Sequence, residues 1–192
     1  MILRCVPRIF SHWMTTQRRF MSLLTPFIIP AGEAEWEALY TTEMPRVYNF
    51  FRYRLGDEQM AEDLTSVTFE KAWRGRARYR RDLAAFSTWL FSIARNVAID
   101  YYRQRHVEVA LEEASHNADE HTPELIVEKK AQFSQLSTLL ARLPSREREL
   151  LAMKYGAGLT NREIAQVTGL SESNVGTILY RTVQGLRAEW QE

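Results

Sequence analysis

Residues 159–187 read LTNREIAQVTGLSESNVGTILYRTVQGLR and predict two helices joined by a tight turn. Thr160 and Glu163 have the spacing of a capping box, in which the threonine oxygen accepts from a backbone N–H and the glutamate returns to the cap. Gly169 falls where the chain must turn, because glycine adopts a positive φ at little cost. Ser171 is placed to cap the second helix. The stretch therefore predicts a helix-turn-helix.

The second of these helices has two different faces. We expect its inner face to hold Val175, Ile178, Leu179, Thr182 and Leu186. The candidate DNA contacts are polar residues of the opposite face and its cap: Ser171, Ser173, Asn174, Thr177, Tyr180, Arg181 and Gln184. Such a helix fits the major groove, where its early residues reach base edges. Because the face carries a single arginine, we expect only modest attraction to phosphates, and a purely structural helix-turn-helix remains the alternative.

The composition sets the class of the whole chain. Its 192 residues are 45% hydrophobic, which permits one ordinary domain or two small ones with packed cores. Six prolines and eight glycines are too few for a β protein with many tight turns, and no strand alternation appears, so an all-α fold is predicted. Cys5 is the single cysteine and no apolar run approaches the ~20 residues of a membrane span. A cytoplasmic protein without membrane insertion is the expectation.

Charge divides the chain into four parts. Residues 1–32 are basic and predict a disordered extension, or an upstream start codon with a later methionine as the true first residue; a targeting role is the alternative. Residues 33–105 and 129–192 predict two small helical domains. Residues 106–128 are acidic and predict a flexible linker, since charge runs are usually solvated spacers.

The first domain opens with an acidic half. Residues 33–73 predict two helices, with Leu55-Gly56-Asp57 as a stop and restart. We expect the second helix to bury one side, made of Met60, Ala61, Leu64, Val67, Thr68 and Ala72. The rest of its surface supplies the candidate partner-binding residues Asp63, Ser66, Phe69, Glu70 and Trp73. Exposed aromatics among acids favour a protein partner over DNA, although Phe69 and Trp73 could instead be core.

The domain continues with a basic half, residues 74–105, in which arginines alternate with aromatics and the only acids are Asp82 and Asp100. A helix begins at about Ser87, and we expect it to bury Phe86, Trp89, Leu90, Ile93, Ala94, Val97 and Tyr101. Its opposite face carries Thr88, Phe91, Arg95, Ile99 and Tyr102. Arginines neutralise phosphates and aromatic rings replace lost base stacking, so this half suits single-stranded DNA. The candidate residues are Arg76, Arg78, Tyr79, Arg80, Arg95, Asn96, Tyr102 and Arg103.

Five motifs in order resemble the extracytoplasmic-function (ECF) group of bacterial RNA polymerase sigma factors, over about Trp36 to Trp190. They are AEDLTSVTFEKAW at 61–73, FSTWLFSIARNVAIDYYR at 86–103, LPSRER at 143–148, GLTNREIA at 158–165 and LSESNV at 170–175. Each alone is weak, whereas the ordered set is specific. Many members of this family carry basic residues where this chain has Gly176 and Ile178, which puts any transferred base assignment in doubt.

The resemblance implies a sigma factor with two small helical domains and no cofactor, metal or enzymatic activity. It implies that the Asp63-to-Trp73 helix binds the β′ clamp helices of core RNA polymerase, with a second contact to the β flap. The basic half would contact and melt the minus-ten element of promoter DNA, and the helix-turn-helix would read the minus-thirty-five element. The linker would pass through the nucleic-acid channel of the polymerase. An anti-sigma factor is a further expected partner.

Three other readings stay open on sequence grounds. A plain transcriptional regulator would bind an operator without joining polymerase, but it needs no arginine and aromatic melting surface. A pure interaction protein would bind polymerase and lack promoter reading. An enzyme finds little support, because no P-loop, dinucleotide turn or catalytic triad order stands out. His116 and His121 could hold a metal loosely, but their place in the linker favours an inert role.

Overall fold

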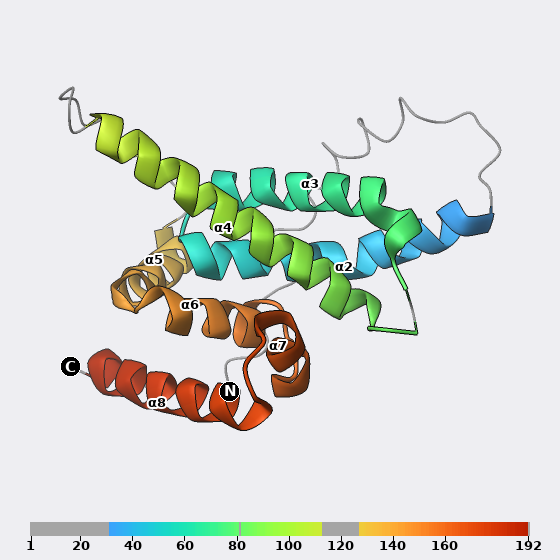
Figure 1. Ribbon diagram of the computed structural model, residues 1–192. Coiled ribbons are helices and arrows are strands. Elements are labelled where there is room, and N and C mark those ends of the chain that lie inside the picture. Colours follow the sequence, from blue (N-terminus) through green and yellow to red (C-terminus); the bar gives the residue numbers. More distant parts are fainter. Residues whose placement is uncertain (1–30, 81, 113–126, 192) are drawn as a thin grey trace. The chain divides into compact units, whose positions relative to one another are not determined.

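The computed structural model describes residues 31–80, 82–112 and 127–191, and within these ranges it contains helices and no strand (Figure 1). The predicted all-α fold class is confirmed. The described residues from Tyr40 onward form one compact unit. The predicted basic extension, apart from its last two residues, and most of the predicted linker lie outside the described residues.

The N-terminal half consists of α2 (Ala31–Leu55), α3 (Glu58–Gly75), the short 3₁₀ helix η1 (Arg76–Arg78) and α4 (Phe86–Glu112). The predicted stop and restart is confirmed. Gly56 ends α2 with a φ of 77°, and the Asp57 carboxylate caps α3 by accepting from the Met60 N–H at 2.9 Å. Helices α3 and α4 pack side by side (Figure 1).

Helix α4 is longer and more completely buried than the sequence predicts. It runs to Glu112, beyond the expected start of the linker at residue 106, because residues 106–112 hold neither glycine nor proline. Phe91 and Thr88, expected on the polar face, are buried, and the Phe91 ring meets the Phe50 ring of α2 at 5.9 Å. The expectation was wrong because α4 contacts α3 and also α7 of the C-terminal half, so two of its faces are covered.

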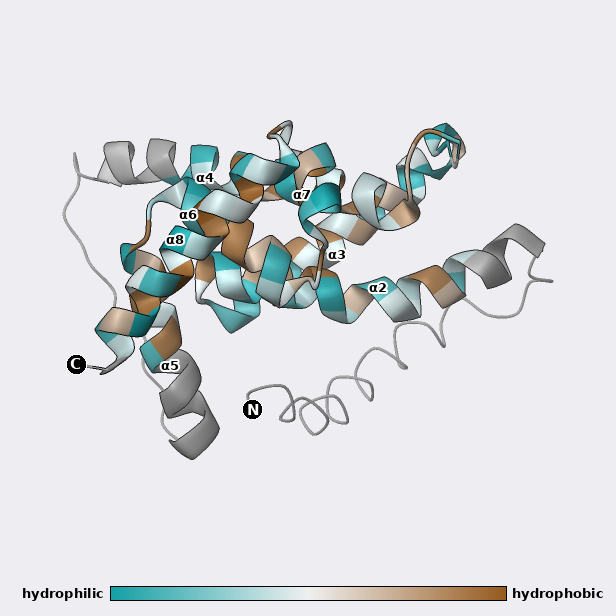
Figure 2. Cartoon of the chain, turned by 90° about the horizontal axis from the view of Figure 1, so that it is seen from below, coloured by the Kyte–Doolittle hydropathy of each residue, from teal (hydrophilic) through white to brown (hydrophobic). Residues whose placement is uncertain are grey.

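The C-terminal half consists of α5 (Val127–Arg142), α6 (Ser145–Leu151), the π-helical turn η2 (Ala152–Gly156), α7 (Asn161–Thr168) and α8 (Glu172–Gln191). The capping box of α7 is present: Thr160 Oγ1 accepts from the Glu163 N–H at 3.2 Å, and Glu163 Oε2 accepts from the Thr160 N–H at 2.8 Å. Gly169 has a φ of 76°, and Ser171 caps α8. Hydrophilic and hydrophobic bands alternate along the coloured parts of the helices (Figure 2), as they do in amphipathic helices. The helix-turn-helix is therefore formed as predicted.

One glycine allows a close approach of two backbones. A Cβ at Gly156, in the π-helical turn, would lie 2.7 Å from the Asn49 carbonyl oxygen of α2, so the two backbones meet here without a side chain between them. A Cβ at Gly176 would lie 3.4 Å from the Asn161 side-chain nitrogen, which is an ordinary van der Waals distance. Packing therefore does not explain the glycine at position 176.

Candidate nucleic-acid interface

The outer face of α8 is a continuous polar surface. All the predicted minus-thirty-five residues are exposed: Ser171, Ser173, Asn174, Thr177, Tyr180, Arg181 and Gln184. The inner residues Val175, Leu179 and Thr182 are buried, and Ile178 is half-buried. Tyr180 is 67% exposed, although a large aromatic side chain is usually at least partly buried. The face presents hydrogen-bonding groups and one guanidinium to solvent.

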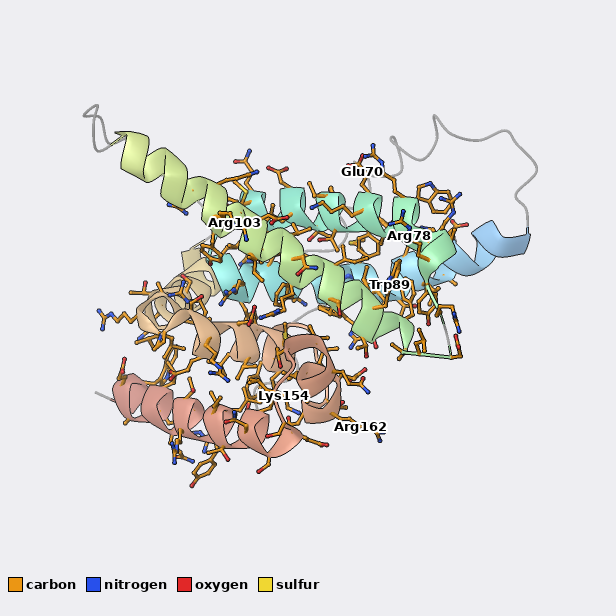
Figure 3. All side chains as sticks on the ribbon, viewed as in Figure 1. Glu70, Arg78, Trp89, Arg103, Lys154 and Arg162 are labelled. Atoms are coloured by element: carbon orange, nitrogen blue, oxygen red, sulfur yellow. The ribbon has the colours of Figure 1, made fainter. Side chains whose placement is uncertain are left out.

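The loop after α3 holds its arginines in weak surface contacts. The Arg76 guanidinium lies over the Trp73 ring at 3.7 Å, and its Nη1 donates to the Trp73 carbonyl oxygen at 2.7 Å. Arg80 donates to both carboxylate oxygens of Asp82, at 2.9 and 2.7 Å, and this pairing raises the pKa of Arg80 and lowers the pKa of Asp82. Arg78 is exposed (Figure 3). Exposed ion pairs of this kind contribute little to stability, so phosphates can replace them.

Three aromatic rings fasten this loop to the first turn of α4. The ring centroids of Tyr79, Phe86 and Trp89 lie 5.1–5.5 Å apart, and Tyr79 donates from its hydroxyl to the Ala84 carbonyl oxygen at 3.3 Å. Trp89 is half-buried, in line with the structural role expected for it. Tyr79 is likewise half-buried, so it supports the loop as well as lining it.

The exposed side of α4 carries a second group of candidates. Asn96 and Arg103 are both exposed (Figure 3 labels Arg103), and Arg103 Nη1 lies 4.0 Å from Asp100 Oδ1. Lys71 of α3 lies 3.6 Å from the other oxygen of Asp100. This surface therefore combines cations from two helices around one acid, and it is open to a polyanion.

Arg95 and Tyr102 lie on a different side of α4 from Asn96 and Arg103. Arg95 Nε is 3.2 Å from Oε1 of Glu149, a residue of α6. The Tyr102 hydroxyl donates to the Arg54 carbonyl oxygen at 2.9 Å. The structure therefore does not bring all the predicted minus-ten residues to one surface. It gives Arg95 and Tyr102 protein partners instead.

Arg54 and Glu149 were missed by the sequence analysis. Both are buried, Arg54 lies 3.9 Å from Glu149, and Arg54 also donates to the Ser145 hydroxyl at 3.0 Å and to the Ser145 carbonyl oxygen. Burial lowers the pKa of Arg54. One signal could have found it: Arg54 continues the helical spacing of the buried Val47 and Phe50, and an arginine in such a stripe needs a buried partner.

The outer side of α3 matches its prediction except at Phe69. Asp63, Ser66 and Glu70 are exposed and Trp73 is half-buried. Phe69, expected to be an exposed anchor, is only 6% exposed and packs edge-on against the Tyr40 ring at 4.6 Å. That expectation was wrong because α2 covers a wider strip of α3 than the apolar pattern indicates, with Thr65 also buried.

Within the part of the chain that the structure describes, no group of three or more His, Cys, Asp or Glu side chains is placed to hold a metal ion. His116 and His121 lie outside it. The described helices likewise include none that is both long and apolar enough to cross a membrane.

Comparison with known families finds two matches. Residues 39–107 match the model of sigma-70 region 2, and residues 133–184 match that of sigma-70 region 4. The chain is 32% identical over 157 residues to the ECF RNA polymerase sigma factor SigM of Bacillus subtilis, covering 79% of this chain and 93% of SigM. It is also 32% identical over 160 residues to the ECF sigma factor BldN of Streptomyces coelicolor, covering 81% of this chain but only 61% of BldN.

Two solved structures have a similar fold. The sigma factor RpoE from Bartonella quintana, in complex with the anti-sigma factor NepR, superposes with a TM-score of 0.69 at 18% identity, over 82% of this chain and 97% of RpoE. CnrH, in complex with the cytosolic domain of CnrY, superposes with a TM-score of 0.58 at 21% identity, over 82% and 86% of the two chains. At these identities the likeness concerns the fold.

Proposed function

The chain belongs to the extracytoplasmic-function group of bacterial RNA polymerase sigma factors. We propose that three of its surfaces have different binding roles in transcription initiation. As a sigma factor it recognises promoters and initiates transcription with RNA polymerase. In this division α8 reads the minus-thirty-five element, the loop after α3 binds the minus-ten element together with α4, and α3 binds core polymerase. The chain acts in the cytoplasm as a binding subunit and performs no catalysis of its own.

The observation that carries the minus-ten assignment is the loop between α3 and α4. Arg76, Arg78 and Arg80 are exposed there, beside the aromatic cluster that contains Tyr79. Opening DNA requires residues that bind the phosphates of one strand and aromatic rings on which the unstacked bases can stack. Such stacking stabilises the bound strand by ~1–3 kcal/mol per base. Arg103 and Asn96 extend the same chemistry along α4.

The minus-thirty-five assignment rests on the exposed face of α8. Its seven residues offer hydroxyls, amides and one guanidinium, which suit base edges in the major groove. Because Arg181 is the only full charge among them, binding by this helix alone is weak, and polymerase adds affinity by holding the helix near its site.

The polymerase assignment rests on the exposed side of α3. Asp63 and Glu70 repel phosphate, whereas the partly exposed Trp73 ring suits a protein interface. We assign this side to the β′ clamp helices and the C-terminal half to the β flap. Since two proteins of similar fold were solved with an anti-sigma factor or with the cytosolic domain of CnrY, an anti-sigma partner is part of the proposal.

The deciding experiment adds the purified protein to core polymerase that lacks sigma, on promoter-bearing DNA. Promoter-dependent transcripts are the expected result. Binding to duplex DNA without any transcripts would favour the plain regulator, and binding to core without transcripts would favour the pure interaction protein.

A finer test separates strand opening from duplex binding. We expect Arg78→Ala and Arg103→Ala to reduce permanganate reactivity of the opened promoter more than they reduce the gel shift of the closed complex. Arg142→Ala, an exposed arginine of α5 outside the two proposed DNA-binding surfaces, is the matched control and should leave the ratio of the two signals unchanged. Equal loss in both assays would refute the melting role.

A further inference from the structure

Gly176 leaves a small indentation in the surface of α8. It is not among the described glycines with a positive φ, so the backbone would accept alanine without strain. A Cβ there would meet a single neighbour among the described residues, Asn161 Nδ2 at 3.4 Å. Glycine is the least favourable helix residue after proline. The chain therefore gives up helix stability at this position, and what it gains is an unfilled space.

The indentation shares one helix face with Ser173, Thr177 and Tyr180. Ser173 and Tyr180 each lie three or four positions from both Gly176 and Thr177, and side chains at this spacing are neighbours on a helix. The Thr177 hydroxyl donates to the Ser173 carbonyl oxygen at 3.0 Å. The hydroxyl is thus turned to its own backbone, which leaves the threonine methyl group for a partner. Because Tyr180 is also largely exposed, this part of the face offers apolar contacts.

Asn161 of α7 borders the indentation on another side. Its Oδ1 is buried and has no hydrogen-bond partner among the described residues. Buried polar atoms are nearly always paired, so an unpaired one in this place calls for a reason. The Asn161 atom nearest to the empty Cβ position is Nδ2, which carries two donor hydrogens. The space at Gly176 therefore has apolar groups along one edge and an amide donor at another.

This combination matches one base of duplex DNA. In the major groove thymine presents its C5 methyl group next to the O4 acceptor, whereas cytosine presents a donor and neither purine has a methyl group. We propose that Gly176 makes α8 specific for a thymine: the methyl group enters the indentation beside Thr177 and Tyr180, and O4 accepts from Asn161 Nδ2. This inference rests on the proposed minus-thirty-five role of α8 and adds Gly176 and Asn161 to its contacts.

The arrangement explains why glycine is kept where alanine would fit. An alanine methyl group would occupy the place that the thymine methyl group enters. Gly176→Ala should therefore stabilise α8 and at the same time abolish the advantage of thymine over a base that lacks the methyl group. If the glycine had no contact with DNA, its replacement would leave the two bases distinguished as before.

The test removes the methyl group from the DNA. Holoenzyme, made of core polymerase and this chain, selects minus-thirty-five elements from random duplexes. Each thymine of the selected element is then replaced in turn by uracil, which keeps O4 and lacks only the methyl group. We expect uracil at one position to weaken binding about fourfold, as the burial of one methyl group predicts.

Protein variants assign that effect to the indentation. At the sensitive position Gly176→Ala should bind thymine and uracil equally. Gly185→Ala is the matched control on the same helix, because a Cβ there meets nothing within 4 Å, and it should keep the fourfold preference. Asn161→Leu, similar in size but without a donor, should weaken binding to both bases and preserve their ratio. Urea denaturation verifies that each variant is folded.

The outcomes separate this inference from the proposed function. A selected element in which no uracil weakens binding, or a uracil effect that survives Gly176→Ala, would overturn the thymine site. Unchanged binding by Asn161→Leu would remove the O4 contact from it. Failure of the minus-thirty-five role looks different: the holoenzyme would select no such element, or the selected element would be the same for the parent and for Arg181→Ala.

Discussion

Phe69 and Trp73 stand four residues apart on α3 and meet different surroundings. Phe69 is buried against Tyr40, whereas Trp73 is half-buried under the Arg76 guanidinium. We expect Phe69→Ala to lower the free energy of unfolding by about 3–5 kcal/mol, the usual cost of an emptied aromatic site. Trp73→Ala removes a surface cation–π contact of about 0.5–1 kcal/mol and should leave the fold intact while weakening binding to core polymerase.

Urea denaturation and a core-polymerase binding assay check the pair. The two variants control for each other, because each removes one ring from the same helix. Normal polymerase binding by a folded Trp73→Ala chain would contradict the assignment of this side of α3.

Gly169 is the residue on which the turn of the helix-turn-helix depends. Its φ of 76° is left-handed, and a Cβ there would meet nothing within 4 Å, so only backbone strain opposes substitution. We expect Gly169→Ala to lower the free energy of unfolding by about 1–2 kcal/mol, and Gly169→Asn to cost less because asparagine tolerates this conformation. Equal stability of the alanine variant and the parent in urea denaturation would show that the turn can rearrange.

At the scale of elements, the cap of α7 makes stability depend on pH. Burial acts to raise the pKa of Glu163, but hydrogen bonds from Thr160 and Ser87 outweigh it and hold the pKa below its ordinary 4.5. The folded pKa is thus below the unfolded one. The contribution of Glu163 is therefore fully present above about pH 4.5 and is lost as the pH falls through the folded pKa.

The comparison of the parent with Glu163→Gln measures this contribution. The stability difference between the two should be largest near about pH 7 and should shrink toward about pH 3 in thermal or urea denaturation. Glu43 works in the opposite direction, because burial raises its pKa despite Arg46, and the Glu163 charge raises it further. Glu163→Gln therefore also relieves part of the Glu43 shift, and the comparison is made with Glu43→Gln in both chains to remove this second titration. A difference that stays constant with pH would mean that the Glu163 carboxylate does not carry the cap.

Local sequence signals predicted most elements. Three features depend only on residues within a few positions of one another: the stop at Gly56, the capping box at Thr160 and the turn at Gly169. Such features can be predicted from a short stretch of sequence. The outer face of α8 followed from helical spacing alone. The π-helical turn at Ala152–Gly156 was not predicted, because it packs against the backbone of α2, which lies more than 100 positions away in the chain.

The site was predicted less completely for the same reason. A helical wheel places Phe91, Arg95 and Tyr102 on one side of α4, but it cannot say that a second helical layer covers that side. Arginine and tyrosine suit a nucleic acid and a buried ion cluster equally well. Only the position of Glu149, on a distant segment, decides which partner Arg95 has in this structure.

For the whole molecule, the docked halves should unfold together. Tyr40–Glu192 form one compact unit, and removal of one partner from a buried ion pair typically costs about 3–5 kcal/mol. We expect a single calorimetric transition for the parent and for Gly185→Ala. Gly156→Ala should give a broader or split transition, because each half then melts with its own stability. Two separated transitions in the parent would show that the contacts between the halves contribute little to cooperativity.

The Glu163 carboxylate uses its two oxygens separately. Oε2 serves the cap of α7 through Thr160, and Oε1 accepts from the Ser87 hydroxyl of α4. If Ser87 is lost, water can take its place at Oε1 without disturbing Oε2. The cap of the first helix of the helix-turn-helix therefore does not depend on its contact with α4.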